Sequence, residues 1–369
     1  MKVAISHDWL VSFGGAERVL EALLEIFPEA DIFTSVLDRS KLPPVFDRVR
    51  IKTSFIQTLP FAGTKYRSYI GLMPAAFRSF DLKGYDLIIS SSHACAKAVR
   101  KPKGVPHICY CHTPMRYIWD MYDEYMSSEA PGMLVKLLAP AGRFYLRGVD
   151  VSSSKDVDRF IANSSFVADR IKRYYGRDSE IIHPPVDTKK FKLSEHAGGY
   201  YLVVSRLVPQ KRTDVIVKAF NEMGKPLKIV GTGRDEERLK RMAGPNIEFL
   251  GFRPDDEVAG LMSGCKALVF ASLEDFGIVP VEAMSCGRPV IAYGAGGVLD
   301  AVVSGDNGTF FYEQTPFSIA AAVLKSEKTA FDPVRIRRSA EKFDKSVFKE
   351  KIRSYILEHM QGNGKAAIG

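Results

Sequence analysis

The sequence has no run of about 18 to 20 apolar residues, so no segment of it is expected to span a bilayer. It holds only five cysteines, and none shows the paired spacing of a zinc site or of a disulfide framework. We therefore expect ordinary thiols in a reduced, cytosolic setting. Short-period repeats and low-complexity tracts are also missing. A composition of 46% hydrophobic and 26% charged residues indicates a globular protein and excludes a disordered or fibrous one.

Dense blocks of one charge are missing as well, although the formal net charge is +9. A basic balance favours anionic partners, such as phosphorylated substrates or an anionic membrane surface. No recognised nucleic-acid module accompanies the basic residues, so nucleic acid is not expected as a partner. Many of them fall in the first half, where a solvated surface and a membrane-facing patch both remain open.

Apolar runs alternate with helical patterns, which is typical of a parallel sheet with helices on both faces. In the first half a helix is predicted over residues 16–27, with strands over 2–6, 85–90, 105–110 and 159–162. In the second half a helix is predicted over residues 213–222, with strands over 200–205, 227–230, 246–250, 267–270 and 289–292. The 369 residues therefore predict two α/β domains with a linker around residues 184–198.

Two glutamates eight positions apart carry the most informative chemistry. Glu274 follows the predicted strand 267–270, at the edge where open α/β sheets bind ligands, and Glu282 falls in the first turns of the next helix. That helix would open with three amides suited to phosphate, those of Phe276, Gly277 and Ile278. The alternative is that both glutamates only favour the positive end of the helix dipole.

Several motifs, in order along the chain, resemble those of the group 1, family 4 retaining glycosyltransferases. In the second half they are Ser205-Arg206-Leu207 with Lys211, residues 229–233 and 249–252, the Glu-x7-Glu of Glu274 and Glu282, and residues 283–292 and 294–297. In the first half they are residues 14–19 and Asn163-Ser164-Ser165. A finer likeness, carried by residues 110–117, is to bacterial mannosyltransferases of O-antigen and exopolysaccharide assembly.

The resemblance implies the GT-B fold, in which two Rossmann-like domains face each other across a cleft. It places an acceptor-side domain at residues 1–190 and a nucleotide-sugar domain at residues 191–344, with a last helix of about residues 345–369 packing back on the first. It also implies transfer of a hexose, mannose from GDP-mannose, to a glycan or lipid-linked glycan in cell-surface polysaccharide synthesis, such as lipopolysaccharide. A UDP-sugar donor, a non-catalytic nucleotide-sugar-binding protein and an epimerase remain alternatives.

The family pattern gives the matched residues roles that fit their chemistry. Arg206 and Lys211 would neutralise the donor pyrophosphate and the charge on the leaving group. Glu282 would accept hydrogen bonds from the ribose, and Glu274 from the transferred sugar. The implied nucleotide-sugar site comprises Gly14, Gly15, Arg206, Lys211, Gly231, Glu274, Phe276, Gly277, Ile278 and Glu282.

His112 follows the predicted strand 105–110, and the resemblance places it near the reacting carbon of the donor sugar. We interpret it as a residue that positions a sugar hydroxyl; His7, at the end of the first strand, is a second candidate. Gly14 and Gly15 would let the backbone approach the diphosphate or the acceptor. No carboxylate is placed as a nucleophile, and the resemblance implies a front-face substitution. Its catalytic residues would be His112, Glu274, Arg206 and Lys211.

Two short motifs suggest other chemistries and are set aside. Asp156-Val157-Asp158 spells the Asp-x-Asp of metal-dependent glycosyltransferases, but it precedes the strand 159–162, away from the ligand edge. We expect no metal and no cofactor beyond the donor substrate. Residues 231–233 lack the full dinucleotide fingerprint because Glu236 takes the place of its last glycine.

Residues 66–80 mix Arg67 and Arg78 with apolar side chains. The segment could lie on an anionic membrane and receive a lipid-linked acceptor, or it could be a helix packed in the domain with its basic residues outward. We favour the first interpretation. The expected location is therefore cytoplasmic. If the segment binds a membrane, we expect peripheral contact with the inner face of the plasma membrane.

Overall fold

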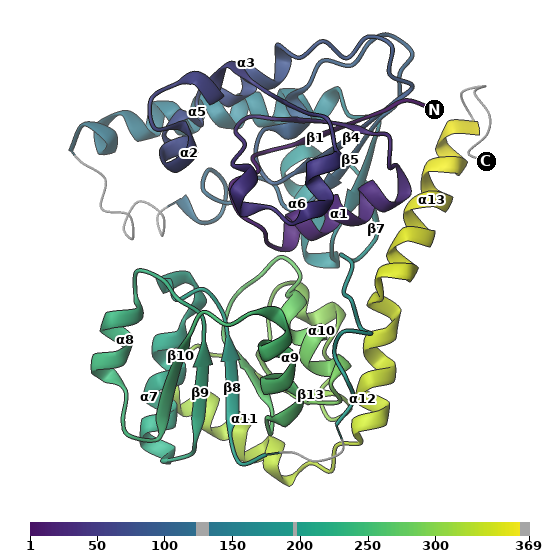
Figure 1. Cartoon of the computed structure of the whole chain (residues 1–369). Helices are drawn as coiled ribbons and strands as arrows, with labels where there is room; N and C mark the ends of the chain where they lie inside the picture. Colours follow the sequence, from purple (N-terminus) through teal and green to yellow (C-terminus); the bar gives the residue numbers. More distant parts are fainter. Residues whose placement is uncertain (123–132, 195–197, 362–369) are drawn as a thin grey trace. The chain divides into compact units, whose positions relative to one another are not determined.

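The computed structural model describes residues 1–122, 133–194 and 198–361. The chain forms two compact units, shown in Figure 1. Unit 1 comprises Met1–His183 together with the chain from Phe348 onward, and unit 2 comprises Pro184–Val347. Among the described residues, no helix combines the length and the apolar character needed to cross a membrane.

Unit 1 is built on a seven-stranded sheet in the order β3-β2-β1-β4-β5-β6-β7, with every paired neighbour parallel. Its strands are β1 (Val3–His7), β2 (Asp31–Thr34), β3 (Ile51–Thr53), β4 (Leu87–Ser92), β5 (His107–Cys111), β6 (Arg159–Ala162) and β7 (Ser179–Ile181). Its helices are α1 (Gly15–Ile26), α2 (Ala62–Lys65), α3 (Met73–Arg78), α5 (Met133–Lys155), α6 (Ser165–Tyr175) and most of α13 (Lys345–Gln361).

Both faces of this sheet are buried, which explains why its central strands read as continuous apolar runs. Along β1 the side chains alternate between two cores: Val3 and Ile5 belong to one, and Ala4 to the other. The first core contains apolar residues of α1 and the second those of α3. Helix α13 contributes one stripe to the first core, through Phe348, Ile352, Ile356 and Met360. This spacing of four places all of its contacts on one face.

Unit 2 is built on a six-stranded sheet in the order β10-β9-β8-β11-β12-β13, again parallel throughout. Its strands are β8 (Tyr201–Val204), β9 (Leu227–Val230), β10 (Ile247–Gly251), β11 (Leu268–Phe270), β12 (Val290–Tyr293) and β13 (Gly308–Phe311). Its helices are α7 (Thr213–Met223), α8 (Glu236–Met242), α9 (Asp255–Gly264), α10 (Ile278–Ser285), α11 (Pro316–Lys328) and α12 (Pro333–Ala340). The cores on its two faces involve α9, α10 and α12 on one side and α7, α8 and α11 on the other.

The predicted pair of Rossmann-like domains is confirmed, but four strands escaped prediction: β2, β3, β7 and β13. All four have only three or four residues. The edge strands β3 and β7 are Ile-Lys-Thr and Ser-Glu-Ile, and no residue of either is buried. Charged, short edge strands protect a sheet from further pairing, and for the same reason they lack an apolar signal.

In each sheet the strand order reverses at one point, between β1 and β4 in unit 1 and between β8 and β11 in unit 2. The connections that leave these strands run to opposite faces, which opens a crevice at their carboxyl ends. Ligands of open α/β sheets bind there. Each unit is therefore expected to carry its functional residues at the ends of these two strands.

Candidate active site

In unit 2, Lys211 and Glu274 form an ion pair at the reversal point of the sheet. Lys211 ends a short 3-10 turn after β8, and Glu274 lies in the loop after β11. Their side chains keep 18% and 27% of their surface exposed. A cation and a carboxylate that are both reachable from solvent could contact the phosphate and the hydroxyl groups of one ligand.

The turn that presents Lys211 is held by an unusual backbone conformation at the next residue. Arg212 has a φ of 53°, in the left-handed region that side chains other than glycine rarely adopt. Its guanidinium group donates a hydrogen bond of 3.0 Å to Gln314 Oε1. The carbonyl of Lys211 accepts a bond of 3.4 Å from Ser272 Oγ. Such strain persists only where neighbours enforce it, and it is found often at functional sites.

The loop that carries Glu274 is fixed by two glycines of the 294–297 motif. The amide of Gly297 donates a hydrogen bond of 2.9 Å to the carbonyl of Glu274. A Cβ on Gly297 would lie 2.0 Å from the carbonyl oxygen of Asp275, and a Cβ on Gly296 would lie 2.6 Å from that of Glu274. Glycine is required because only hydrogen fits between the two backbones. The sequence suggested no role for this motif.

The helix that follows begins where the sequence predicts. Gly277 is the N-cap of α10, with a φ of 91°, and Ile278 is its first residue. Glu282 lies in the second turn, and only 5% of its surface is exposed. Phe276 is buried in the core beneath the loop. The amides at this helix start are the backbone groups that an anion would bind.

The other predicted unit 2 residues lie at the ends of neighbouring strands. Arg206 follows β8 and is exposed. Gly231 follows β9, with a φ of 127°, and a Cβ there would lie 1.9 Å from the carbonyl oxygen of Ser205. Glycine is therefore required at this position for a structural reason, because the two strand ends approach each other too closely for a side chain.

In unit 1, His112 comes directly after β5 and is 9% exposed. Its Nε2 atom lies 2.8 Å from Ser91 Oγ, and its carbonyl accepts a hydrogen bond of 2.9 Å from Asn163 Nδ2. Its own amide donates to the carbonyl of Ser92. These bonds fix the backbone and one edge of the ring, so His112 is held in place before any ligand binds.

The serines behind His112 were misread from the sequence. The predicted strand ends at residue 90, whereas β4 continues through Ser92 and all three serines are buried. Ser91 also lies 3.0 Å from Nδ1 of His7, at the end of β1. A serine after an apolar run resembles a turn residue, so only the sheet register identifies its role.

His7 connects further to the start of α1. Its Nε2 atom lies 3.6 Å from a carboxylate oxygen of Glu17, and the other carboxylate oxygen accepts a hydrogen bond of 2.8 Å from the amide of Gly14. Gly14 is the N-cap of α1 and Gly15 its first residue. The predicted glycines thus border the same group of side chains as His7.

A second buried carboxylate shapes the loop after β4. Asp8 accepts four backbone hydrogen bonds of 2.6 to 2.9 Å, from the amides of residues 93–96. Its carboxylate also lies 3.2 Å from Nδ1 of His93. His93 received no predicted role, yet its ring centre lies 6.2 Å from that of His112. Asp8 therefore determines where this third histidine stands.

Burial governs the charge of His112. It lowers the pKa of the imidazole well below its ordinary value, and the neighbouring His93 and His7 lower it further. Burial likewise lowers the pKa of His93, against the opposing effect of Asp8. His112 is therefore neutral at neutral pH, which suits a residue that exchanges hydrogen bonds with hydroxyl groups.

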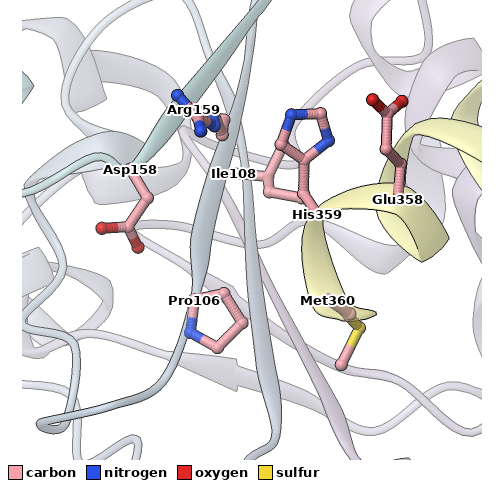
Figure 2. Close-up of a pocket in the computed structure, with 7 residues that line it drawn as sticks. All are labelled: Pro106, Ile108, Asp158, Arg159, Glu358, His359 and Met360. Carbon is pink, nitrogen blue, oxygen red and sulfur yellow. The ribbon is translucent and has the colours of Figure 1, made fainter. Parts of the chain in front are cut away.

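One pocket of about 450 Å³ lies in unit 1 (Figure 2). It lies at the amino end of β5, whereas His112 follows the carboxyl end of that strand. It is lined by Pro106, Ile108, Asp158, Arg159, Glu358, His359 and Met360. These residues come from the amino ends of β5 and β6 and from the last turns of α13. The pocket therefore does not contain the predicted site residues.

The Asp-x-Asp motif lies at this same amino edge. Asp158 pairs with Lys101, and its second oxygen accepts a hydrogen bond of 2.7 Å from the amide of His107. These partners give the carboxylate a structural role. Within the described ranges, no group of three or more potential metal ligands is found.

Comparison with known proteins identifies both halves of the chain. The family described as Glycosyltransferase Family 4 matches residues 13–190, and the family described as Glycosyl transferases group 1 matches residues 186–343. An uncharacterized glycosyltransferase of Methanocaldococcus jannaschii is 25% identical over 338 residues, which is 88% of each chain. A GDP-mannose-dependent alpha-(1-6)-phosphatidylinositol monomannoside mannosyltransferase of Mycolicibacterium smegmatis is 30% identical over 206 residues, 47% of this chain and 52% of that protein.

Among solved structures, HepE of Anabaena in complex with UDP and glucose is similar to this chain. The TM-score is 0.70 at 19% identity, and the match covers 96% of this chain and 98% of HepE. At this identity the likeness concerns the fold, and it identifies the fold as GT-B.

Proposed function

The chain belongs to the group 1, family 4 glycosyltransferases, and from this premise we propose that it is a retaining mannosyltransferase. It takes mannose from GDP-mannose and transfers it to a glycan acceptor, free or lipid-linked, in cell-surface polysaccharide synthesis. The observation that carries the proposal is the Lys211–Glu274 pair at the reversal point of the unit 2 sheet. Positive charge for a pyrophosphate and an acceptor for sugar hydroxyls are both present there.

In this proposal, different residues of unit 2 contact different parts of the donor. Lys211 and the exposed Arg206 neutralise the pyrophosphate and the charge that grows on it as the glycosidic bond breaks. Glu274 accepts hydrogen bonds from hydroxyls of the transferred sugar, and Glu282 from the ribose. The departing phosphate helps to deprotonate the incoming hydroxyl, so the protein contributes orientation and charge stabilisation.

The donor identity has separate support. The mannosyltransferase of Mycolicibacterium smegmatis is GDP-mannose-dependent, and its likeness covers about half of each chain. The motif around His112 points the same way. HepE, by contrast, binds UDP and glucose, and its fold is the same. A UDP-sugar would use the same phosphate and ribose contacts, so it is the second candidate donor.

Thermal unfolding in the presence of nucleotides tests the proposal. A ligand that binds only the folded state raises the unfolding midpoint. At a ligand concentration of a hundred times its Kd, it adds about 2.7 kcal/mol to the free energy of unfolding. We expect GDP and GDP-mannose to raise it, with or without EDTA, because the proposed site uses no metal. In Glu282→Ala the shift should be lost.

Each outcome of this experiment has a clear meaning. A shift with UDP alone keeps the transferase and replaces mannose as the donor sugar. A shift that EDTA abolishes contradicts the metal-free mechanism. If no nucleotide shifts the midpoint, the result favours a non-catalytic binding protein on a transferase fold. Turnover of the donor sugar without an acceptor would instead identify an epimerase.

The acceptor side of the proposal includes peripheral contact with an anionic membrane. Within residues 66–80, Met73 and Phe77 are fully buried, which supports the packed alternative for those positions. The exposed apolar side chains of this region are Phe55, Phe61 and Leu72. Of these, Phe61 lies close to Lys65, whose ammonium group is 5.1 Å from the ring centre. Apolar and basic groups together suit an anionic lipid surface.

Liposomes with anionic lipid test this contact. We expect co-sedimentation that is lost in Phe61→Ala/Lys65→Ala and is retained in Phe317→Ala, which removes a ring of similar exposure from unit 2. Equal loss in both variants, or no binding by the wild type, would contradict the membrane hypothesis and leave an acceptor that is free in solution.

A further inference from the structure

Four side chains of unit 1 lie in one line of contacts, hereafter the histidine relay: Glu17, His7, Ser91 and His112. They come from α1 and from the ends of the adjacent strands β1, β4 and β5. The successive distances are 3.6 Å, 3.0 Å and 2.8 Å. The exposed fractions along the line are 5%, 0%, 0% and 9%. Solvent therefore reaches the line at its His112 end more than at its inner members.

The chemistry of these groups sets the direction of the protons. A carboxylate can only accept, so Glu17 favours the proton on Nε2 of His7. A His7 ring with a single proton, held on Nε2, presents Nδ1 as an acceptor. The hydroxyl of Ser91 donates to it, and the oxygen of Ser91 is left to accept from Nε2 of His112.

Glu17 is suited to this starting position. Burial works to raise the pKa of its carboxyl group, but the interaction with His7 and the hydrogen bond from the backbone outweigh burial, and the pKa lies below its ordinary value. The group is thus ionised at neutral pH. Other charged groups nearby do not interrupt the line, since Asp8 is engaged by the amides of residues 93–96 and by His93.

We propose that the histidine relay fixes the neutral tautomer of His112, with the proton on Nε2 and with Nδ1 as a hydrogen-bond acceptor towards a hydroxyl of the transferred sugar. Naming the sugar rests on the proposed function; the tautomer does not. Ser91, His7 and Glu17 are positioning residues, because they act on the ligand only through His112. A ring with a fixed acceptor loses no binding energy to the wrong tautomer when the sugar arrives.

The chain supplies a matched control one residue away. Ser90 is also buried in β4, and its hydroxyl lies 2.9 Å from Nε2 of another histidine, His107. Since successive side chains of a strand point to opposite faces, Ser90 lies on the other face of the sheet from Ser91. Ser90→Ala therefore removes a serine–histidine contact of the same kind without touching the histidine relay.

Nitrogen-15 NMR of histidine-labelled protein at neutral pH measures the tautomer directly. The seven histidines give few signals, and His112→Gln assigns the one in question. We expect a single Nε2–H tautomer of His112 in the wild type and in Ser90→Ala. In Ser91→Ala we expect loss of that single state. An Nδ1–H tautomer in the wild type, or no change in Ser91→Ala, would overturn the proposal.

Activity gives a second reading. In Ser91→Ala we expect kcat/KM for sugar transfer to fall about 10- to 100-fold while the thermal shift by nucleotide is kept, because the nucleotide residues belong to unit 2. Ser90→Ala should keep the activity. If the wild type transfers no sugar, the proposed function fails, whereas the NMR result still decides the proposal on the tautomer.

Discussion

Lys211 and Glu274 form an ion pair although they are 63 positions apart in the sequence. One belongs to the turn after β8 and the other to the loop after β11, and these strands are neighbours because the strand order reverses between them. The pair therefore exists because of the sheet topology. Because both side chains are partly exposed, the pair is expected to contribute little to the stability of the fold.

We predict that Lys211→Met and Glu274→Gln each reduce kcat/KM for sugar transfer by about 100- to 1,000-fold, because each removes a group that contacts charge or hydroxyls in the transition state. The free energy of unfolding should change by less than about 1 kcal/mol, as for other partly exposed ion pairs. Steady-state kinetics and urea unfolding measure the two effects.

The pair of Lys225 and Glu327 is a control in the same unit, with 2.9 Å between its charged atoms and similar exposure. Lys225→Met should leave activity unchanged. If Lys211→Met instead lost several kcal/mol of stability and kept its activity, the pair at the reversal point would be structural.

Gly297→Ala should inactivate the protein without changing any charged group. The new methyl group would have to displace the carbonyl of Asp275, which lies 2.0 Å from the Cβ position, and with it the loop of Glu274. We expect loss of most transfer activity and a lower unfolding temperature. Gly260→Ala is the control, because this position in α9 has no atom within 4 Å of the added group. It should raise stability by about 0.5 to 1 kcal/mol; a similar loss in both variants would contradict the prediction.

Stability should fall in mild acid through His107. Burial lowers the pKa of this histidine to about 4, whereas an unfolded histidine titrates near 6.5. Between these values the unfolded chain binds a proton that the folded chain does not, so stability decreases as the pH falls from 6.5 to 4, by up to about 1.4 kcal/mol per pH unit. Urea unfolding of His107→Gln should give a flatter profile over this range. An unchanged slope in His107→Gln would show that other groups cause the acid sensitivity.

Asp8→Asn should destabilise unit 1 strongly. The carboxylate accepts four backbone amides, and a carboxamide presents an NH₂ group to two of them. Hydrogen bonds to a charged group contribute about 1.5 to 3 kcal/mol each, so we expect a loss of at least about 3 kcal/mol in urea unfolding. Asp86→Asn, which weakens one exposed bond to the amide of Lys2, should cost under about 1 kcal/mol. Equal effects would mean that the amides after β4 find other acceptors.

The strands that the sequence missed are all short: β2 is buried along its whole length, whereas β3 and β7 have no buried residue. The bounds of β6 and β9 agree with prediction to the residue, because apolar runs between polar ones mark them. Strands β3 and β7 carry a lysine and a glutamate on exposed edges, so no pattern marked them.

The candidate residues of unit 2 could be proposed from the sequence because they are charged residues and glycines within short contiguous motifs. The supporting residues were not. Ser91 acquires its role from the register that pairs β1 with β4, in which it stands opposite His7. Gly297 acquires its role from a backbone that passes 2.0 Å from its missing Cβ. Both depend on contacts between distant segments, which a single sequence does not contain.

Helix α13 has a consequence for how the protein is made. Its apolar stripe, from Phe348 to Met360, belongs to the core formed by the first strand and the first helix of the chain. During synthesis these residues follow the whole of unit 2, so the amino-terminal core stays incomplete until they too have been made. Unit 2 comprises Pro184–Val347 alone, so it can complete its folding first. Folding of this chain is therefore expected to start with unit 2. A chain truncated at residue 344, which lacks α13, should leave the core of unit 1 incomplete and accessible to chaperones and proteases.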